Sequence, residues 1–361
     1  MNSDRHSLNL LLLSTPVGAL GSGLGGGVEL TLRNIALELI RRGHSVEILA
    51  PMGSDMPGLS IAQIGGKLHT TAQTQGRSAS IEMPGDSVLA NMWEHARENQ
   101  SQYDLLMNFA YDWLPFYLTP FLSTPTAHLV SMGSLTLAMD NVIGKTAAQF
   151  PGTIGMHSRA QAETFDFAAD CRCLGNGIDL RSYDFCAEPE NYLGWVGRIA
   201  PEKGIEDAIA AADRLSIPLK IWGAMPDSDY WDKICLTYPD ALFTYEGFLS
   251  TGALQKALGR CRGLLMTHKW VEAFGNVAIE ALACGVPVIS YKRGGPAEIV
   301  QDGVTGWLVE PDSLDGLVEA IARLPQVDRQ ACRQRAEAEY SMLAMGDRVE
   351  AWFYDILKTK I

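Results

Sequence analysis

Two glutamates, Glu272 and Glu280, stand eight residues apart in the stretch KWVEAFGNVAIEALAC. Glu280 lies in an otherwise apolar segment that predicts a helix from Asn276 to Cys284. A charged carboxylate is costly to bury unless a partner binds it. Glu272 falls in the loop before the helix, so two carboxylates and a helix N-terminus with free N–H groups could bind a polyhydroxylated, phosphorylated ligand. The alternative is that Glu280 is a capped or salt-bridged helix residue.

Two cations occur in the segment GRIAPEKG, where Arg198 follows a predicted strand and Lys203 begins a helix. Two positive side chains beside the positive end of a helix suit a diphosphate. The alternative is a pair of solvated surface cations. The position of Arg198 favours the ligand-binding interpretation, because open α/β sheets bind ligands at the carboxyl ends of their strands.

A glycine-rich segment, GALGSGLGGG, includes Gly21, Gly23 and Gly26 at the spacing of the dinucleotide-binding G-x-G-x-x-G motif. The glycines begin several residues after the first strand, and no acidic residue ends the second strand, so a dinucleotide site is disfavoured. Gly26 and Gly27 precede a helix directly, and their N–H groups suit an anion or a sugar. The alternative is a tight turn.

A histidine, His128, occurs in the apolar segment TAHLVSM. We place it at the exit of a strand, where it is either a site residue or a core histidine. Two patterns resemble metal-binding motifs, but their sequence context argues against a metal. Asp227 and Asp229 fall in a turn, and the Cys171–Cys173 pair has no second cysteine pair at the spacing of zinc ligands. We therefore expect no metal.

The elements that position these residues alternate between strand and helix. A strand from Leu8 to Ser14, the glycine-rich loop, a helix from Val28 to Arg42 and the strand HSVEILAP form a βαβ unit, which predicts a parallel sheet. A second series begins with NYLGWVGRI. The sequence thus predicts an α/β protein with domains at residues 1–182 and 183–339, and a last helix at 340–361 that packs back on the first domain. Residues 52–88 are expected to form a long loop near a ligand cleft.

The composition narrows the class of protein. The chain has 361 residues and a net charge of −13, which argues against nucleic-acid binding and makes anionic membranes unfavourable partners. Seven cysteines, an odd number, indicate reduced thiols in a cytoplasmic protein. The N-terminal apolar run LNLLLL is too short for a signal peptide, and no segment is long enough to span a membrane.

Together these motifs resemble the retaining GT-B glycosyltransferases of family 4. The resemblance rests on GGGVE, on NGID from Asn176 to Asp179, on GRIAPEKG and on EAFGNVAIE, and it continues through CGVPVISYKRGGPAEIVQDGVTGWLVEPD. It covers nearly the whole chain and is strongest from Tyr192 to Asp312. It implies two Rossmann-like domains whose parallel sheets face a central cleft, with a nucleotide-sugar donor in that cleft.

The resemblance also implies residue roles. Arg198 and Lys203 would hold the donor diphosphate, Glu280 the ribose hydroxyls and Glu272 the sugar hydroxyls. His128 would lie near the reacting sugar and complete a catalytic set with Glu272, Arg198 and Lys203. Neither metal nor cofactor is implied, because the cations and a helix dipole stabilise the leaving group. The remaining donor-binding residues would be Gly26, Gly27, Phe248, Leu249, Phe274, Gly275, Asn276 and Val277.

The acceptor is a separate expectation. The segments STPVGALGSGLGGGVELTL, LMNFAYDWLPFYLTPF and HLVSMGS are similar to cyanobacterial family members that transfer glucose from UDP-glucose to tetrahydrobiopterin. This implies a small pterin acceptor, with Tyr111, Trp113 and Met132 in the loops that bind it. Core packing is the alternative for the aromatic residues. The alternative functions are transfer to a membrane lipid or another metabolite, and binding of a nucleotide sugar without turnover.

Overall fold

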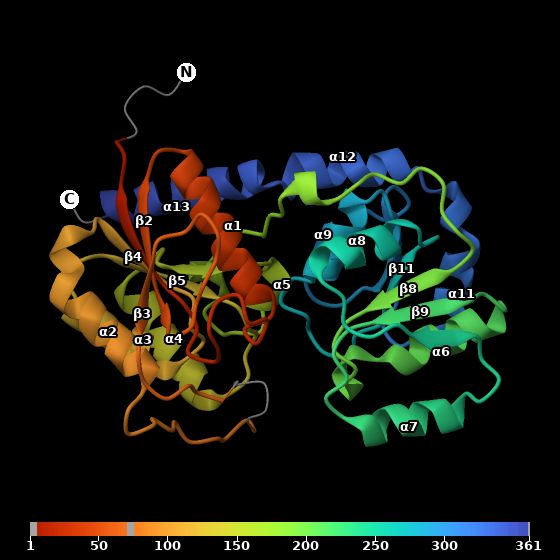
Figure 1. The fold of residues 1–361 in the computed structure, drawn as a ribbon, viewed down its shortest axis with the longest axis horizontal. Helices are drawn as coiled ribbons and strands as arrows, with labels where there is room; N and C mark the ends of the chain where they lie inside the picture. Colours follow the sequence, from red (N-terminus) through yellow and green to blue (C-terminus); the bar gives the residue numbers. More distant parts are fainter. Residues whose placement is uncertain (1–5, 71–75, 360–361) are drawn as a thin grey trace. The chain divides into compact units, whose positions relative to one another are not determined.

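The computed structural model describes residues 6–70 and 76–359, which form two compact units (Figure 1). The first unit comprises Met1–Gly177 and Met342–Ile361, and the second comprises Ile178–Ser341. The chain thus leaves the first unit once and returns to it for its last helix.

A seven-stranded parallel sheet forms the centre of the first unit, in the order β3-β2-β1-β4-β5-β6-β7. Strand β1, in the interior of this sheet, has four consecutive leucines because both of its faces are covered. Leu10 and Leu12 pack in the cluster that includes helices α1 (Gly27–Arg41) and α13 (Met342–Lys358), whereas Leu11 and Leu13 pack against α2 (Val88–Asn99). The strands are β1 Asn9–Leu13, β2 Ser45–Pro51, β3 Ile61–Ile64, β4 Leu105–Asn108, β5 Thr126–Val130, β6 Ile154–Met156 and β7 Arg172–Cys173.

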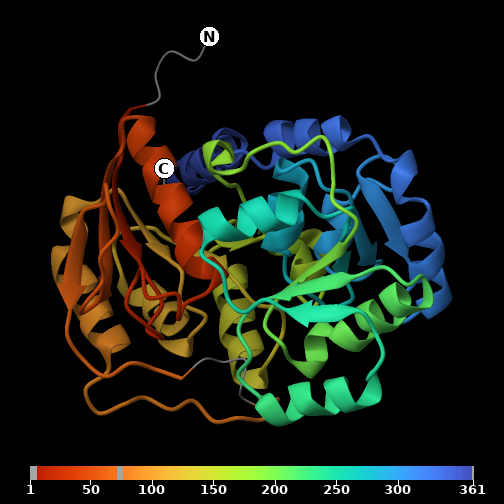
Figure 2. The same cartoon turned by 45° about the vertical axis from the view of Figure 1, so that its right-hand side comes forward.

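Helix α13 belongs to the first unit although it ends the chain. It packs beside α1 in both views (Figures 1 and 2), and Trp352 Nε1 donates to the Gly152 carbonyl at 2.6 Å. Gly346 lets the two helices approach, since a Cβ there would lie 2.5 Å from Glu38 Cγ. The helices of this unit are α1 Gly27–Arg41, α2 Val88–Asn99, α3 Trp113–Leu118, α4 Leu137–Gln149, α5 Arg159–Ala162 and α13 Met342–Lys358.

The second unit has a six-stranded parallel sheet in the order β10-β9-β8-β11-β12-β13. Its strands are β8 Leu193–Val196, β9 Leu219–Trp222, β10 Phe243–Tyr245, β11 Leu264–Met266, β12 Val288–Tyr291 and β13 Gly306–Val309. Its helices are α6 Ile205–Arg214, α7 Ser228–Thr237, α8 Thr251–Gly259, α9 Asn276–Ala283, α10 Pro296–Ile299, α11 Leu314–Ala322 and α12 Arg329–Glu339.

Each sheet reverses its strand order once, between β1 and β4 in the first unit and between β8 and β11 in the second. Ligands of open α/β sheets bind outside the carboxyl ends of the strands at such a reversal. The carboxyl ends of these four strands are therefore the places to look for a site.

One expectation about the elements is wrong. Residues 52–88 do not form a single loop, because β3 (Ile61–Ile64) pairs with β2 at the edge of the first sheet, with Ile61 opposite Ile48. Part of this range, residues 71–75, lies outside the described residues.

All seven cysteines are free thiols. Within the described part of the chain, every helix is too short or too polar to cross a membrane.

Candidate functional site

Lys203 and Glu272 meet at the strand reversal of the second unit. Lys203 ends the short turn Pro201–Lys203 after β8, Glu272 follows β11, and the two side chains form an ion pair. Trp270 supports both, because its Nε1 donates to Glu272 Oε2 at 3.0 Å and its ring centroid lies 5.0 Å from Lys203 Nζ. Burial would raise the pKa of Glu272, but the Lys203 ammonium outweighs burial and holds that pKa below its usual value. Glu272 is thus a charged carboxylate.

The loops that carry this pair are joined to each other. Thr267 Oγ1 donates to the Gly204 carbonyl at 2.6 Å, and Lys269 N donates to the Glu202 carbonyl at 2.8 Å. Gly204 has φ +62°, and a Cβ there would lie 2.1 Å from the Thr267 carbonyl oxygen. Only glycine fits this close crossing, which fixes the position of Lys203 relative to Glu272.

Arg198 follows β8, and its side chain is 38% exposed while paired with Glu202. Each cation of the candidate site therefore has a carboxylate partner from the chain itself. A phosphorylated ligand would have to replace Glu202 and Glu272 as the partners of Arg198 and Lys203.

The N-terminus of α9 follows Glu272 closely in the chain. Gly275, the residue before the helix, has φ +95°, a conformation that a residue with a Cβ adopts only with strain. The loop after β12 supports the backbone of Glu272, because Gly295 N donates to the Glu272 carbonyl at 2.8 Å. Asn276 and Val277 form the first turn of α9, so the structure brings these predicted residues next to Glu272.

Glu280 lies on the buried side of α9. Tyr183 Oη donates to Glu280 Oε1 at 3.2 Å, and within the described residues no ion pair to Glu280 is found. Burial raises the pKa of Glu280 to about 7, and the bond from Tyr183 offsets only part of that rise. Sequence reasoning missed Tyr183, because the two residues are 97 positions apart.

The other residues predicted to bind the donor differ in exposure. Phe248 follows β10 and is 75% exposed, so its ring is accessible, whereas Leu249 is half-buried against the core. Phe274 is buried, and its ring lies edge-on to Tyr340 with centroids 6.1 Å apart. In the first unit, Gly26 is the N-cap of α1 and Gly27 is the first residue of that helix.

His128 is not at the exit of its strand, and that expectation is wrong. It is the middle residue of β5 and is 0% exposed. Its Nε2 lies 2.8 Å from Thr119 Oγ1, its Nδ1 lies 3.3 Å from Asn108 Nδ2, and its ring stacks on Phe116 with centroids 4.4 Å apart. Burial lowers the pKa of His128 to about 3, so the ring is neutral. In this position it is a satisfied core histidine, and a catalytic role stays a prediction.

Tyr111 and Met132 lie on the loops after β4 and β5, whereas Trp113, expected in a loop, is the first residue of α3. Tyr111 Oη donates to the Gly133 carbonyl at 3.2 Å and so links the two loops. Gln161 Nε2 holds the second loop by donating to the Met132 carbonyl at 2.9 Å. Trp113 stacks on Tyr117 with ring centroids 4.4 Å apart. The structure therefore brings the predicted acceptor loops together at the carboxyl edge of the first sheet.

His69 lies at this edge and was missed by sequence reasoning. Its Nδ1 lies 2.9 Å from Asp112 Oδ2 and its Nε2 lies 2.7 Å from Ser87 Oγ. Ser87 is the N-cap of α2 and Asp112 is the N-cap of α3, so His69 connects the starts of two helices. Both N-caps are readable from the sequence, but a lone histidine in a Gly- and Ser-rich stretch gives no signal.

The predicted turn with Asp227 is a helix start, because Asp227 Oδ1 accepts from Tyr230 N at 3.0 Å. Across the described residues, no group of three or more His, Cys, Asp or Glu side chains could hold a metal ion.

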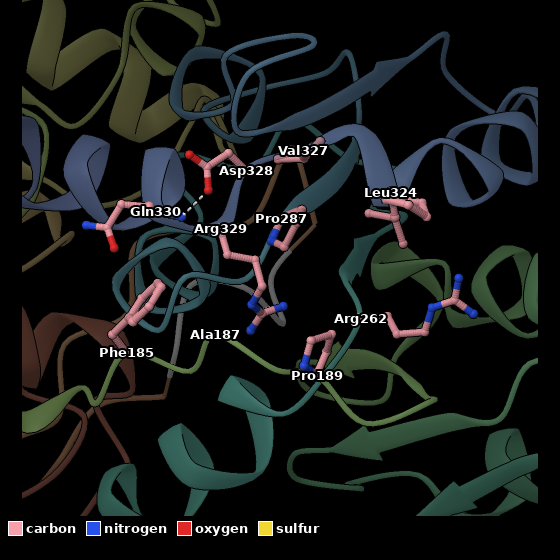
Figure 3. Close-up of a pocket in the computed structure, with 11 residues that line it drawn as sticks. Phe185, Ala187, Pro189, Arg262, Pro287, Leu324, Val327, Asp328, Arg329 and Gln330 are labelled. Atoms are coloured by element: carbon pink, nitrogen blue, oxygen red, sulfur yellow. Dashed lines mark hydrogen bonds between the residues drawn. The ribbon is translucent and has the colours of Figure 1, made fainter.

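A pocket of about 400 Å³ lies away from the carboxyl edge of the second sheet (Figure 3). Arg262 and Pro287 line it just before β11 and β12 begin, so it lies at the amino ends of these strands. The guanidinium of Arg329 in this pocket donates to the carbonyls of Cys186, Cys261 and Gly259. The pocket is thus distinct from the Lys203–Glu272 site.

Comparison with known families identifies the second unit. Residues 185–340 match the family described as glycosyl transferases group 1. This match contains Arg198, Lys203, Glu272 and Glu280, the charged residues described above.

Individual proteins similar to this chain include a glycogen synthase and a glycosyltransferase. Glycogen synthase of Mycobacterium tuberculosis is 32% identical over an alignment of 181 positions, which covers 47% of this chain and 43% of that protein, so the chain matches under half of its length. D-inositol 3-phosphate glycosyltransferase of Rhodococcus erythropolis is 26% identical over 96% of this chain and 90% of that protein. The solved structure of Anabaena HepE in complex with UDP-glucose superimposes with a TM-score of 0.73 at 18% identity, over 98% of this chain and 100% of that one.

The two parallel sheets match those of GT-B glycosyltransferase structures along nearly the whole chain. The chain therefore has the GT-B fold, and its residues 185–340 match the group 1 glycosyltransferase family.

Proposed function

We propose that this protein is a retaining glycosyltransferase that moves glucose from UDP-glucose to a small soluble acceptor, tetrahydrobiopterin, in the cytoplasm. The observation that carries the proposal is the cluster of Arg198, Lys203 and Glu272 at the strand reversal of a group 1 glycosyltransferase domain.

The donor would bind through an exchange of partners. Its diphosphate takes Lys203 from Glu272 and Arg198 from Glu202, and the released Glu272 carboxylate accepts hydrogen bonds from the sugar hydroxyls. Glu280 then accepts from the ribose hydroxyls, which compensates for its burial. Anabaena HepE, which shares this fold, binds UDP-glucose and supports the choice of donor.

The chemistry would depend on positioning and charge. Arg198 and Lys203 stabilise the negative charge that develops on the leaving UDP, so the reaction needs no metal. The acceptor hydroxyl attacks the face of the sugar from which the diphosphate departs and gives its proton to a leaving phosphate oxygen. The new glycosidic bond therefore has the same anomeric configuration as the donor. Glu272 acts in this scheme as a sugar ligand and not as a nucleophile.

The acceptor loops of the first unit would bind the pterin. Trp113 already stacks on one aromatic ring, and an aromatic face accepts a flat heterocycle in the same way. Tyr111 and Met132 lie on the linked loops after β4 and β5. The choice of tetrahydrobiopterin rests on the resemblance of the segments around these residues to pterin-modifying relatives.

Mass spectrometry of the reaction products tests the proposal. Purified protein is incubated with UDP-glucose, tetrahydrobiopterin and EDTA, and the expected product is the pterin heavier by one hexose, with UDP released. NMR of the product should show an α-glycoside. UDP release without a pterin adduct would contradict the choice of tetrahydrobiopterin as acceptor. A requirement for added divalent metal would contradict the metal-free scheme. Binding of UDP-glucose without turnover of any acceptor would contradict the proposal that the protein is an enzyme.

A further inference from the structure

Glu29 organises the glycine-rich loop of the first unit. Its carboxylate accepts hydrogen bonds from three backbone N–H groups: Gly21 at 2.8 Å, Gly23 at 3.3 Å and Gly25 at 2.6 Å. The side chain comes from the first turn of α1, where a negative charge is favoured by the helix dipole. Glu29 is only 6% exposed, although the glycines around it are exposed or half-buried.

The loop is shaped around this carboxylate. Gly21 and Gly23 have φ values of +92° and +80°, which bring alternate N–H groups toward one point, as in an anion-binding nest. A Cβ on Gly25 would lie 2.8 Å from Glu29 Cγ, so the side chain fills the space that a larger residue would need. The anion of this nest is therefore part of the chain.

The position of Glu29 differs from that of an ordinary capping glutamate. A glutamate at the third helical position usually accepts from the N–H of the N-cap residue. Here the N–H of the N-cap, Gly26, donates instead to the Gly23 carbonyl at 3.1 Å, and Glu29 reaches further back along the chain. The loop thus closes into a fixed turn that ends at Gly26 and Gly27.

We propose that Glu29 is a positioning residue, a built-in anion that holds residues 21–25 in one conformation and so presents the N-terminus of α1 to the sugar nucleotide. The part of this inference that concerns the ligand rests on the proposed function, whereas the part that concerns the loop does not. Among the described residues, the Glu29 carboxylate accepts its hydrogen bonds from backbone N–H groups of its own loop, so its effect on the reaction is indirect.

Chemical rescue of Glu29→Ala in the full chain tests the inference. Hydrogen exchange of the Gly21, Gly23 and Gly25 amides should become faster in this variant, and formate should slow it again by occupying the empty nest. Chloride at the same ionic strength should not. Ser22→Ala is the matched control, because Ser22 Oγ bonds Ala19 and Leu24 in the same loop without contacting Glu29. Unchanged exchange in Glu29→Ala, or slowing by chloride equal to that by formate, would overturn the proposal.

The kinetic readout separates positioning from a purely structural role. Misplacement of a binding loop predicts that kcat/KM for the donor falls about 10- to 100-fold, again reversed by formate. A fall that formate leaves unchanged would overturn the role in the reaction. If Glu29→Ala does not fold, Glu29→Gln decides, since it keeps one of the two oxygens and should speed exchange at Gly25 or at both Gly21 and Gly23, whichever lose their acceptor. If the unaltered protein transfers no sugar, the proposed function fails and the exchange result alone still decides the role of Glu29.

Discussion

Glu280 is a buried carboxyl group, and the folded protein favours its protonated form. Its pKa rises from 4.5 to about 7, so unfolding releases a proton between these values, and folded stability falls as pH increases from 4.5 to 7. Above pH 7 the buried charge of Glu280 lowers the free energy of unfolding by on the order of 3 kcal/mol. We therefore expect Glu280→Gln to unfold at higher urea concentration than the unaltered protein at pH 8, and at a similar concentration at pH 4.5.

The same substitution should weaken donor binding, because an amide accepts ribose hydroxyls less well than a carboxylate. Calorimetric titration with UDP checks this part. Glu319→Gln, at an exposed position of α11 in the same unit, is the control and should change neither property. Greater stability at pH 8 with unchanged UDP affinity would show that Glu280 is not a ligand of the donor.

The Lys203–Glu272 ion pair leads to a prediction about the diphosphate and the sugar of the donor. UDP alone must break this ion pair without giving Glu272 a new partner, whereas UDP-glucose supplies the sugar hydroxyls. Glu272→Gln removes the ion pair, so it should bind UDP more tightly and UDP-glucose less tightly than the unaltered protein. Calorimetric titrations with each ligand measure the two changes. A parallel loss of affinity for both ligands would contradict the exchange of partners.

Arg198 should be essential for transfer and dispensable for folding. Its side chain is exposed enough that losing the pair with Glu202 costs about 1 kcal/mol or less. Loss of a charge that stabilises the leaving group predicts a fall in kcat of at least ~100-fold for Arg198→Ala. Arg214→Ala removes a comparable exposed pair with Asp315 and is the control. Near-normal turnover by a folded Arg198→Ala protein would exclude the assigned role.

At the scale of elements, the start of α9 depends on one glycine. A Cβ on Gly275 would lie 2.7 Å from Pro296 Cγ, and the residue has φ +95°. Gly275→Ala should therefore lower the free energy of unfolding by about 1–3 kcal/mol. Gly252→Ala is the matched control, because a Cβ there meets nothing within 4 Å and α8 should gain about 0.5–1 kcal/mol. Urea unfolding of both variants measures the difference, and equal effects would contradict the strain at Gly275.

Elements with strong periodicity were predictable. The helix expected from Asn276 to Cys284 is α9, Asn276–Ala283, and the one expected from Val28 to Arg42 is α1, Gly27–Arg41. Strand β3 was not predictable, because four residues at a sheet edge show little alternation and depend on pairing with β2.

The positions of candidate site residues were predictable where a motif combines charge with a strand end, as for Arg198 and Lys203 after β8, and their roles stay predictions. It was not predictable where a partner comes from a distant part of the chain. Tyr183 beside Glu280 and Ser87 beside His69 are set by tertiary packing, which spacing does not encode. His128 was misplaced for a related reason, since an apolar run does not reveal which of its residues ends the strand.

At the scale of the whole molecule, the first unit is built from two separate stretches of the chain. Trp352 of α13 is buried in it and closely approaches Gly155 of β6, where a Cβ would lie 2.8 Å from the indole. Loss of such a buried ring costs about 3–5 kcal/mol. We expect Trp352→Ala in the full chain to speed hydrogen exchange throughout residues 6–70 and 76–177, and to leave residues 178–341 unchanged. Mass spectrometry of peptides from both units measures this contrast. Faster exchange confined to α13, or spread equally over both units, would show that the returning helix does not complete the core of the first unit.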